Sequence, residues 1–356
     1  SVTALVAVNP EGEVLWQRGG GGRPDIGYDV PCTIYDLNGD GKTEVLYSSE
    51  GDLIVLEGAT GREIRRHALP DGLRAADCIV LTDLRGLGRR QDVVIKDRYA
   101  KVYAYTAEFE PLWRWEGNTG HHPEPADIDG DGKDELRCGF ATLDDDGTVL
   151  WQNDLPGHAD TTRIGLVDDA HETRILSACC GGNQMALFDV RGNMLWQMKP
   201  PHDYHFQTAL IGDVRRDLPG REIVVDNGWA RPGRAPLLIV SAQGEIIGTY
   251  YPDYQRFFAL VDWDAGGEMQ IAIPQSAGLF DGRGNKRVEL LNVPPPNEGG
   301  KETPFVRAAD VCGDGRDEII IHNGERIVVY TDPRPAPRPI PPQPCEQARH
   351  YNFTFY

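Results

Sequence analysis

The chain has 356 residues, enough for a large core, and its 55 acidic against 36 basic residues give a formal net charge of -19. A surface this negative repels nucleic acid and anionic membranes, so neither is expected as a partner. There is no run of about eighteen apolar residues, and the first ten residues lack the basic-then-apolar pattern of a signal peptide. The seven cysteines form no CxxC pair, which argues against a zinc ribbon or a thioredoxin motif and leaves disulfides open.

The first predicted elements are a β-hairpin at 4–17, which ends in GEVLWQ, and a strand that runs into the stretch DLNGDGKTEV at Asp36. This stretch recurs as DIDGDGKDEL at Asp127 and as DVCGDGRDEI at Asp310, and in each copy an acid follows the first Asp by eight positions. Degenerate copies begin at Asp83, Asp168, Asp213 and Asp262. A period of about 40–50 residues is typical of propellers and solenoids.

Each repeat has the same internal order: an apolar strand that ends in Asp, a turn, a second strand, and two further strands around a Gly turn, as in GTVLWQ and GNMLWQ. Four short strands per repeat and no amphipathic helix predict an all-β, seven-bladed β-propeller over residues 1–332. The hairpin at 4–17 is expected to close the last blade, with a partial eighth blade as the alternative. The Pro-rich run in 333–356 is expected to be a strap that brings the C-terminal tail back onto the propeller.

The Asp-rich loops carry the ligands of a calcium site, although an Asp-Gly turn can also form without a metal. The last acidic residue of the loop comes earlier than in an EF-hand, and strands rather than helices lie on either side of the loop. We therefore expect a tighter set of oxygen ligands around a calcium ion that stabilises the blade. The degenerate turns are expected to be held by Arg or by hydrogen bonds. The predicted calcium ligands are Asp36, Asn38, Asp40, Glu44, Asp127, Asp129, Asp131, Glu135 and, less favoured because Cys312 is a poor ligand, Asp310, Asp314 and Glu318.

Polar residues gather five to ten positions ahead of these loops, where the innermost strand of each blade would begin. In a propeller these starts converge on the mouth of the central channel, opposite the Asp loops. His, Tyr and Arg there predict a pocket for an anionic, hydroxyl-rich ligand, although a single His in such a loop often only bonds a carbonyl. Zinc at His121, His122 and His158 is an alternative. The residues are Tyr28, Arg74, His121, His122, His158, Arg163, Tyr204, His205, Gln207, Tyr254, Arg256 and Lys301.

Organic cofactors are not expected, because the sequence has no phosphate loop and no dinucleotide fingerprint. Trp16, Trp113, Trp151 and Trp196 recur at one place in the repeat. A quinone-dependent propeller could use such residues, but docking between neighbouring blades explains them better. No nucleophile context of the GxSxG type supports a serine hydrolase.

The segments TGHHPEPA, LPGHADTTRIG and GDVRRDLPGREIVV, together with IVVYTDPRP leading to RHYNFTFY, resemble the calcium-stapled propeller polysaccharide lyases of the rhamnogalacturonan, ulvan and rhamnose-glucuronate lyase type. The resemblance implies a secreted or periplasmic monomer that cleaves a rhamnose- and uronate-containing polysaccharide by β-elimination. In such a reaction His or Tyr moves the proton, and Arg or a metal neutralises the uronate carboxylate.

On this resemblance the catalytic candidates are His122, His158, Tyr204, His205, Arg163 and Arg256, and the substrate-binding candidates are His121, Arg74, Tyr28, Gln207, Tyr254 and Lys301. Two alternatives stay open. A lectin or adhesion propeller would repeat equivalent sites around the ring. A propeller glycoside hydrolase, such as a rhamnosidase, would need two carboxylates, for which Glu124 and Asp160 are the candidates.

Overall fold

The structure is a computed structural model that describes residues 2–20, 29–169, 171–180, 184–199, 205–227, 237–250, 257–296, 304–312, 314, 316–334, 349–350 and 353–354. These residues form β-strands and two short 3-10 turns, Pro70–Gly72 and Pro274–Ser276, with no α-helix among them. The all-β prediction is therefore confirmed. No helix in the described part of the chain is long and apolar enough to cross a membrane.

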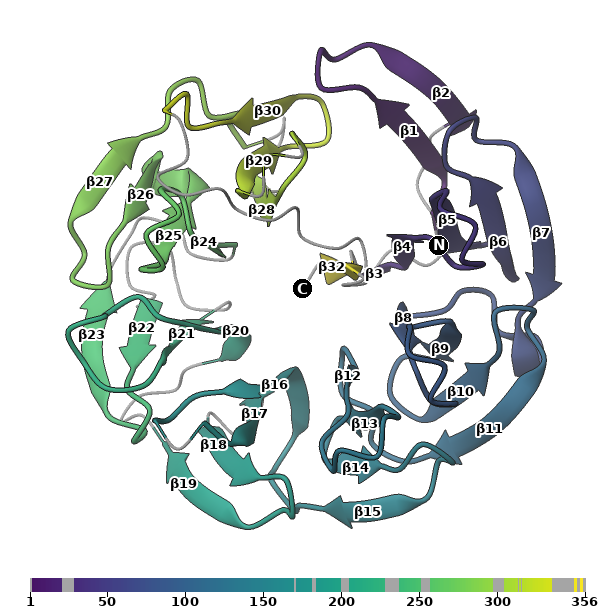
Figure 1. Cartoon of the computed structure of the whole chain (residues 1–356), viewed down its shortest axis with the longest axis horizontal. Helices are drawn as coiled ribbons and strands as arrows, with labels where there is room; N and C mark the ends of the chain where they lie inside the picture. Colours follow the sequence, from purple (N-terminus) through teal and green to yellow (C-terminus); the bar gives the residue numbers. More distant parts are fainter. Residues whose placement is uncertain are drawn as a thin grey trace. The chain divides into compact units, whose positions relative to one another are not determined.

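The chain divides into two compact units, Ser1–Thr162 with Pro344–Tyr356, and Arg163–Gln343. The first unit holds the hairpin strands β1 and β2 and three larger sheets (Figure 1). Its strands are β1 (Ala4–Val8), β2 (Val14–Gly19), β3 (Asp29–Val30), β4 (Cys32–Tyr35), β5 (Glu44–Ser49), β6 (Asp52–Glu57), β7 (Glu63–Ala68), β8 (Cys78–Thr82), β9 (Asp92–Lys96), β10 (Lys101–Tyr105), β11 (Pro111–Glu116), β12 (Glu124–Ala126), β13 (Glu135–Cys138), β14 (Ala141–Leu143), β15 (Val149–Gln152), β31 (Arg349–His350) and β32 (Phe353–Thr354).

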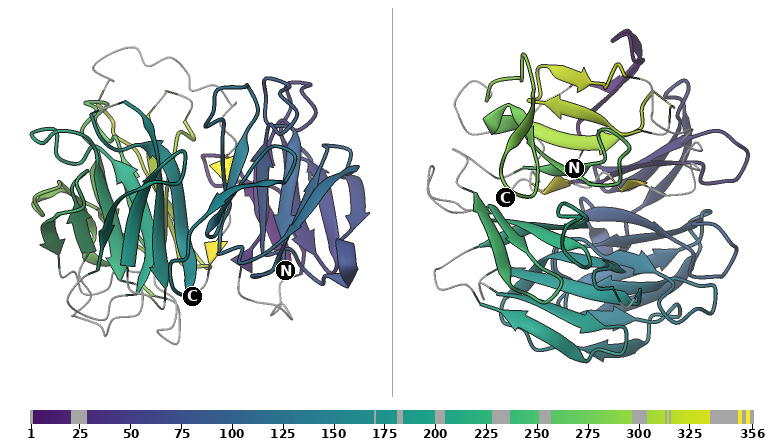
Figure 2. Two further views of the ribbon diagram at one scale, coloured as in Figure 1. Left: turned by 90° about the horizontal axis from the view of Figure 1, so that it is seen from below. Right: turned by 60° about the vertical axis from the view of Figure 1, so that its left-hand side comes forward.

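The second unit, coloured from teal to yellow in Figure 2, contains four sheets, and the first of them begins with β16, which includes residues on both sides of the 162/163 boundary. The strands are β16 (His158–Leu166), β17 (Thr173–Cys180), β18 (Gln184–Asp189), β19 (Met194–Met198), β20 (Phe206–Gly212), β21 (Glu222–Asn227), β22 (Leu237–Val240), β23 (Ile246–Tyr250), β24 (Ala259–Val261), β25 (Gln270–Ile273), β26 (Gly278–Phe280), β27 (Lys286–Glu289), β28 (Phe305–Ala309), β29 (Glu318–His322) and β30 (Ile327–Tyr330).

In the described residues, seven antiparallel sheets follow one another along the chain. Six of them contain four consecutive strands, to the first of which β31 is added at the edge next to β4, and the last has the three strands β28, β29 and β30. This is the seven-bladed β-propeller arrangement that the repeat predicts. The hairpin β1–β2 is a separate two-stranded sheet, so its role in closing the last blade stays a prediction. In the tail, β31 pairs with β4 and β32 pairs with β3.

The hydrophobic core lies between neighbouring sheets. In the first unit one cluster joins the sheets β4–β7 and β8–β11, and another joins β8–β11 to β12–β15. The middle strands are buried on both faces, as β9 is throughout, whereas the fourth strands alternate between exposed and half-buried residues. Within this unit the first strands β4, β8 and β12 lie side by side, and β7, β11 and β15 form the opposite edges (Figure 1).

Three of the recurrent tryptophans, on β2, β11 and β19, each donate a hydrogen bond to a turn of a following sheet. Trp16 Nε1 donates to the carbonyl of Gly58 at 2.7 Å, and Trp113 Nε1 donates to that of Asp145 at 2.7 Å. Trp196 makes the same bond to Ala242 in the second unit. These contacts support docking between sheets, as expected, for the three residues.

Each Asp-rich loop joins the first strand of a sheet to the second. The acid eight positions after the first Asp begins the second strand: Glu44 begins β5, Glu135 begins β13, and Glu318 begins β29. The residues ahead of the first strand therefore lie at the opposite end of that strand. This separates His121, which precedes β12, from the Asp127 loop, which follows it.

Candidate active site

His121 lies in the segment before β12 and His158 begins β16, and hydrogen bonds hold these two segments together. The His121 N–H donates to the carbonyl of Ala159 at 3.0 Å, and Thr162 Oγ1 donates to the carbonyl of His122 at 3.0 Å. Gly120 has a φ of +58°, and a Cβ there would lie 2.7 Å from the carbonyl oxygen of Ala159. Glycine is therefore required at this position, because the two segments approach too closely for a side chain.

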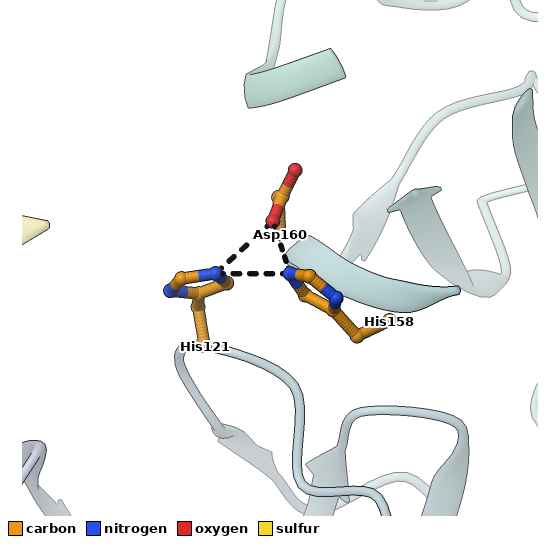
Figure 3. A group of neighbouring side chains, drawn as sticks. All are labelled: His121, His158 and Asp160. Carbon is orange, nitrogen blue, oxygen red and sulfur yellow. Dashed lines mark hydrogen bonds and ion pairs between the residues drawn. The ribbon is translucent and has the colours of Figure 1, made fainter. Parts of the chain in front are cut away.

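The side chains of His121, His158 and Asp160 converge on one point (Figure 3). Asp160 Oδ1 lies 3.1 Å from His121 Nε2 and 3.1 Å from His158 Nε2, and the two nitrogens are 3.3 Å apart. Ligands about 2.1 Å from a metal ion and at right angles to each other are about 3 Å apart. The three atoms therefore have the spacing of one face of a metal coordination shell with open positions, the two-His, one-carboxylate pattern.

The electrostatics of the cluster favour a neutral His121. Burial lowers the pKa of His121 below its ordinary value, while the hydrogen bond to Asp160 opposes that shift. The side chains of His121 and Asp160 are 3% and 2% exposed, whereas that of His158 is 28% exposed. Solvent, and hence a ligand, reaches the cluster on the His158 side. A neutral imidazole can bind a cation, and a buried carboxylate gains most from one.

Tyr99 completes the cluster from the neighbouring sheet. Its hydroxyl lies 3.3 Å from His121 Nε2, and its ring packs against the ring of His158 with centroids 4.9 Å apart. The guanidinium carbon of Arg98 lies 5.0 Å from the centre of the Tyr99 ring. A phenol and a guanidinium thus lie beside the two imidazoles and the carboxylate, and such groups can transfer a proton next to a bound anion.

The other predicted pocket residues have different outcomes. The ring centroid of His122 lies 6.2 Å from that of His121, and His122 is not one of the three residues whose ligand atoms come together in the described structure, so zinc at His121, His122 and His158 stays a prediction. Arg74 is exposed, and its carbonyl accepts the N–H of Gly51. Arg163 and His205 are half-buried and Gln207 is buried, all in the second unit. Tyr28, Tyr204, Tyr254, Arg256 and Lys301 lie outside the described residues.

Among the Asp-rich loops, that at Asp127 has the donor set of a cation site. Ligand atoms of Asp127, Asp129 and Glu135 all lie within 4.8 Å of one another. Glu135 Oε2 accepts the N–H of Ile128, while Glu135 Oε1 is buried with no hydrogen-bond partner in the described structure. Burial, with Asp129 and Asp131 nearby, raises the pKa of Glu135 to about 7. A buried, unpartnered carboxylate oxygen among other carboxylates fits calcium.

The loops at Asp36 and Asp310 instead have arginine close to their carboxylates. Arg89 donates to the carbonyl of Asp36, and its guanidinium lies 3.7 Å from the carboxylate of that residue. In the last loop Arg316 binds Asp314 through two nitrogens. The calcium sites predicted there, with Asn38, Asp40, Glu44, Asp310 and Glu318, stay predictions. Among the degenerate loops, Arg85 binds the buried Asp92 at 2.7 Å, as expected for turns held by Arg.

Sequence reasoning missed Tyr99, Arg98, Lys96 and Asp77, all near the cluster. Lys96 ends an apolar strand, DVVIK, in which every residue is buried. A lysine inside such a run is the one signal that could have been used, because a fully buried ammonium needs a partner. Asp160 was considered only as a hydrolase carboxylate.

Comparison with known proteins places these features in a family context. The family model described as "Rhamnogalacturonan lyase family 11, C-terminal domain" matches residues 93–341. Rhamnogalacturonan endolyase YesW of Bacillus subtilis (strain 168) is 24% identical over 365 aligned residues, which cover 84% of this chain and 56% of YesW. Rhamnogalacturonan exolyase YesX of the same organism is 41% identical over 56 residues, or 16% of this chain and 9% of YesX.

Solved structures show the same fold. The structure titled "Bacillus licheniformis Rhamnogalacturonan Lyase PL11" has a TM-score of 0.71 at 21% identity, over 92% of this chain and 65% of that one. The crystal structure of YesW has a TM-score of 0.65 at 21% identity, over 95% and 66% of the two chains. The chain thus spans a little over half the length of the curated relative YesW.

Proposed function

Because the chain belongs to rhamnogalacturonan lyase family 11, we propose that it cleaves a rhamnose- and uronate-containing polysaccharide by β-elimination at the cluster of His121, His158, Asp160 and Tyr99. The observation that carries the proposal is the convergence of two imidazole nitrogens and one carboxylate oxygen beside a phenol. The names of YesW and of the Bacillus licheniformis lyase support the substrate class.

β-Elimination needs three groups around the uronate. The carboxylate at C5 must be neutralised so that the C5 proton becomes acidic, a base must remove that proton, and the oxygen that leaves C4 must receive a proton. The electrons of the C5–H bond become the C4–C5 double bond as the C4–O bond breaks. A divalent cation at the two-His, one-carboxylate face would neutralise the uronate carboxylate.

The residues of the chain supply the remaining roles. His121 and His158 offer their Nε2 atoms, and Asp160 offers Oδ1, to hold the cation. Tyr99 is the proton carrier, because its hydroxyl lies beside this face at 3.3 Å from His121 Nε2. Arg98, stacked on the Tyr99 ring, adds positive charge on the side where the carboxylate binds. The Asp127 loop is proposed to hold a structural calcium ion, since it lies at the other end of β12.

The test is the ultraviolet absorbance of unsaturated uronate released from rhamnogalacturonan. Tyr99→Phe is expected to lower kcat by about 10²–10⁴-fold, the usual contribution of a positioned acid or base. Asp160→Asn is expected to lower kcat and to weaken binding of the divalent cation, because it removes the carboxylate ligand of the proposed cation site. Tyr103→Phe is the matched control, because the Tyr103 hydroxyl bonds Asp71 away from the cluster. Reducing ends without unsaturated product would indicate a hydrolase, and binding without cleavage would indicate a lectin; either result contradicts the proposal.

A further inference from the structure

A fully buried lysine lies beneath the cluster. The side chain of Lys96 is 0% exposed, and its Nζ donates to Asp77 Oδ2 at 2.6 Å, to the Asp97 carbonyl at 2.7 Å and to the Arg98 carbonyl at 2.6 Å. An ammonium has three N–H donors, and each has an acceptor here. Two of the three acceptors are backbone carbonyls of the turn that follows β9, so the ammonium fixes the path of that turn.

Asp77 holds the same turn from its other side. One carboxylate oxygen of Asp77 accepts from Lys96, and the other accepts from Arg98 Nη1 at 3.0 Å. The turn also closes on itself, because the Asp97 carboxylate accepts the N–H groups of Ala100 and Lys101. The two residues before Tyr99 are therefore fixed by their backbone carbonyls, and Arg98 is fixed by its side chain as well.

Tyr99 is the residue that this arrangement presents to the cluster. The guanidinium carbon of Arg98 lies 5.0 Å from the centre of its ring, and the centroid of the His158 imidazole is 4.9 Å away. The ring of His121 meets the Tyr99 ring edge-on at 5.5 Å. A shift of the turn by about 1 Å would carry the hydroxyl away from His121 Nε2, and misplacement of that size is enough to cost about 10²-fold in rate.

Stability alone does not account for the pair of Lys96 and Asp77. Taking an ammonium and a carboxylate out of water costs much of what their attraction returns, and apolar residues of similar volume are often equally stable. We propose that Lys96, paired with Asp77, is a positioning residue that holds Tyr99 against His121 through the backbone of the 97–99 turn. The kinetic part of this inference rests on the proposed lyase function, whereas its structural part does not.

The structural part is tested with protein that carries 3-fluorotyrosine. The Tyr99 resonance is assigned as the fluorine signal that disappears in Tyr99→Phe. In Lys96→Met the Tyr99 signal is expected to move or broaden, while the signal of Tyr103 in β10 stays in place. The double variant Asp77→Asn/Lys96→Met removes both charges of the fully buried pair and leaves Arg98 an amide oxygen as partner, and it serves as a second test if the single variant does not fold.

The kinetic part is a double-mutant cycle. Lys96→Met is expected to lower kcat by about 10–100-fold in the wild-type background and to have almost no effect in the Tyr99→Phe background, because the two residues act as one unit. An unchanged Tyr99 signal overturns the inference whatever the activity. Failure of both variants to fold also overturns it, since the pair would then serve stability.

A third outcome is that the Tyr99 fluorine signal moves but Lys96→Met lowers kcat equally in the wild-type and Tyr99→Phe backgrounds. The pair of Lys96 and Asp77 would then only support the structure, and this result would overturn its role in positioning Tyr99 for catalysis. If the wild-type chain released no unsaturated product, the proposed function would fail, while the fluorine signals would still decide whether Lys96 positions Tyr99. The two failures are therefore distinguishable.

Discussion

Glu135 offers the sharpest test of the metal assignment in the Asp127 loop. Its carboxylate is fully buried, and its pKa rises from an ordinary 4.5 to about 7 because of burial and the nearby Asp129 and Asp131. Between these two values the folded chain holds a proton that the unfolded chain has released. The free energy of unfolding without metal therefore falls as the pH rises through this window.

The size of the effect follows from the shift. About 2.5 pH units at 1.36 kcal/mol each amount to about 3 kcal/mol lost between pH 4.5 and pH 8. Glu135→Gln removes this titration, so in a chelator the variant should lose about 3 kcal/mol less than the wild type over that range. Calcium at the Asp127 loop should stabilise the wild type at pH 8 by about 2.7 kcal/mol at 100 times Kd, and this part of the calcium response should be absent in the variant.

Glu222 provides a matched control. It is buried, begins β21 at the equivalent place, and has its pKa raised to about 7, mainly by burial. Glu222→Gln should flatten the pH dependence in the same way and keep the calcium response of the wild type. Urea unfolding at several pH values, with chelator and with calcium, measures both quantities. A full calcium response in Glu135→Gln, or an unchanged pH dependence, would refute the reasoning.

Three further predictions follow from contacts described above. Gly147→Ala should lower the free energy of unfolding by at least about 1–3 kcal/mol, measured by urea denaturation, because Gly147 has a φ of +85° and its Cβ would lie 2.7 Å from the Trp113 ring. Arg89→Ala should raise the affinity of the Asp36 loop for calcium, and calorimetry showing an unchanged or lower affinity would contradict a competing role for the guanidinium. Burial lowers the pKa of His121, so cobalt should still bind the cluster of His121, His158 and Asp160 at a pH below the ordinary pKa of histidine. A titration of the cobalt absorbance in which binding is lost at that ordinary pKa would contradict this.

The repeat allowed much of the fold to be predicted, because each strand-Asp-turn-strand unit encodes one sheet locally. The same local order predicted His121 and His158 near the starts of first strands, at the end away from the Asp loops, and the structure has His121 before β12 and His158 as the first residue of β16. Tyr99 could not be predicted in this way, because its contact with His121 joins two different sheets. Nor could the interaction of Arg89 with Asp36, since those residues are 53 positions apart and meet only when the sheets pack.

The tryptophan contacts between sheets have a consequence for how the chain comes apart. Because the indole of one sheet bonds the turn of the following sheet, as Trp16 does to Gly58 and Trp113 to Asp145, loosening one sheet removes a partner from its neighbour. Stability is then shared between nearest neighbours, as in repeat proteins. Partial denaturation should therefore release groups of adjacent sheets together, and hydrogen exchange should report the same protection for neighbouring sheets rather than a separate value for each.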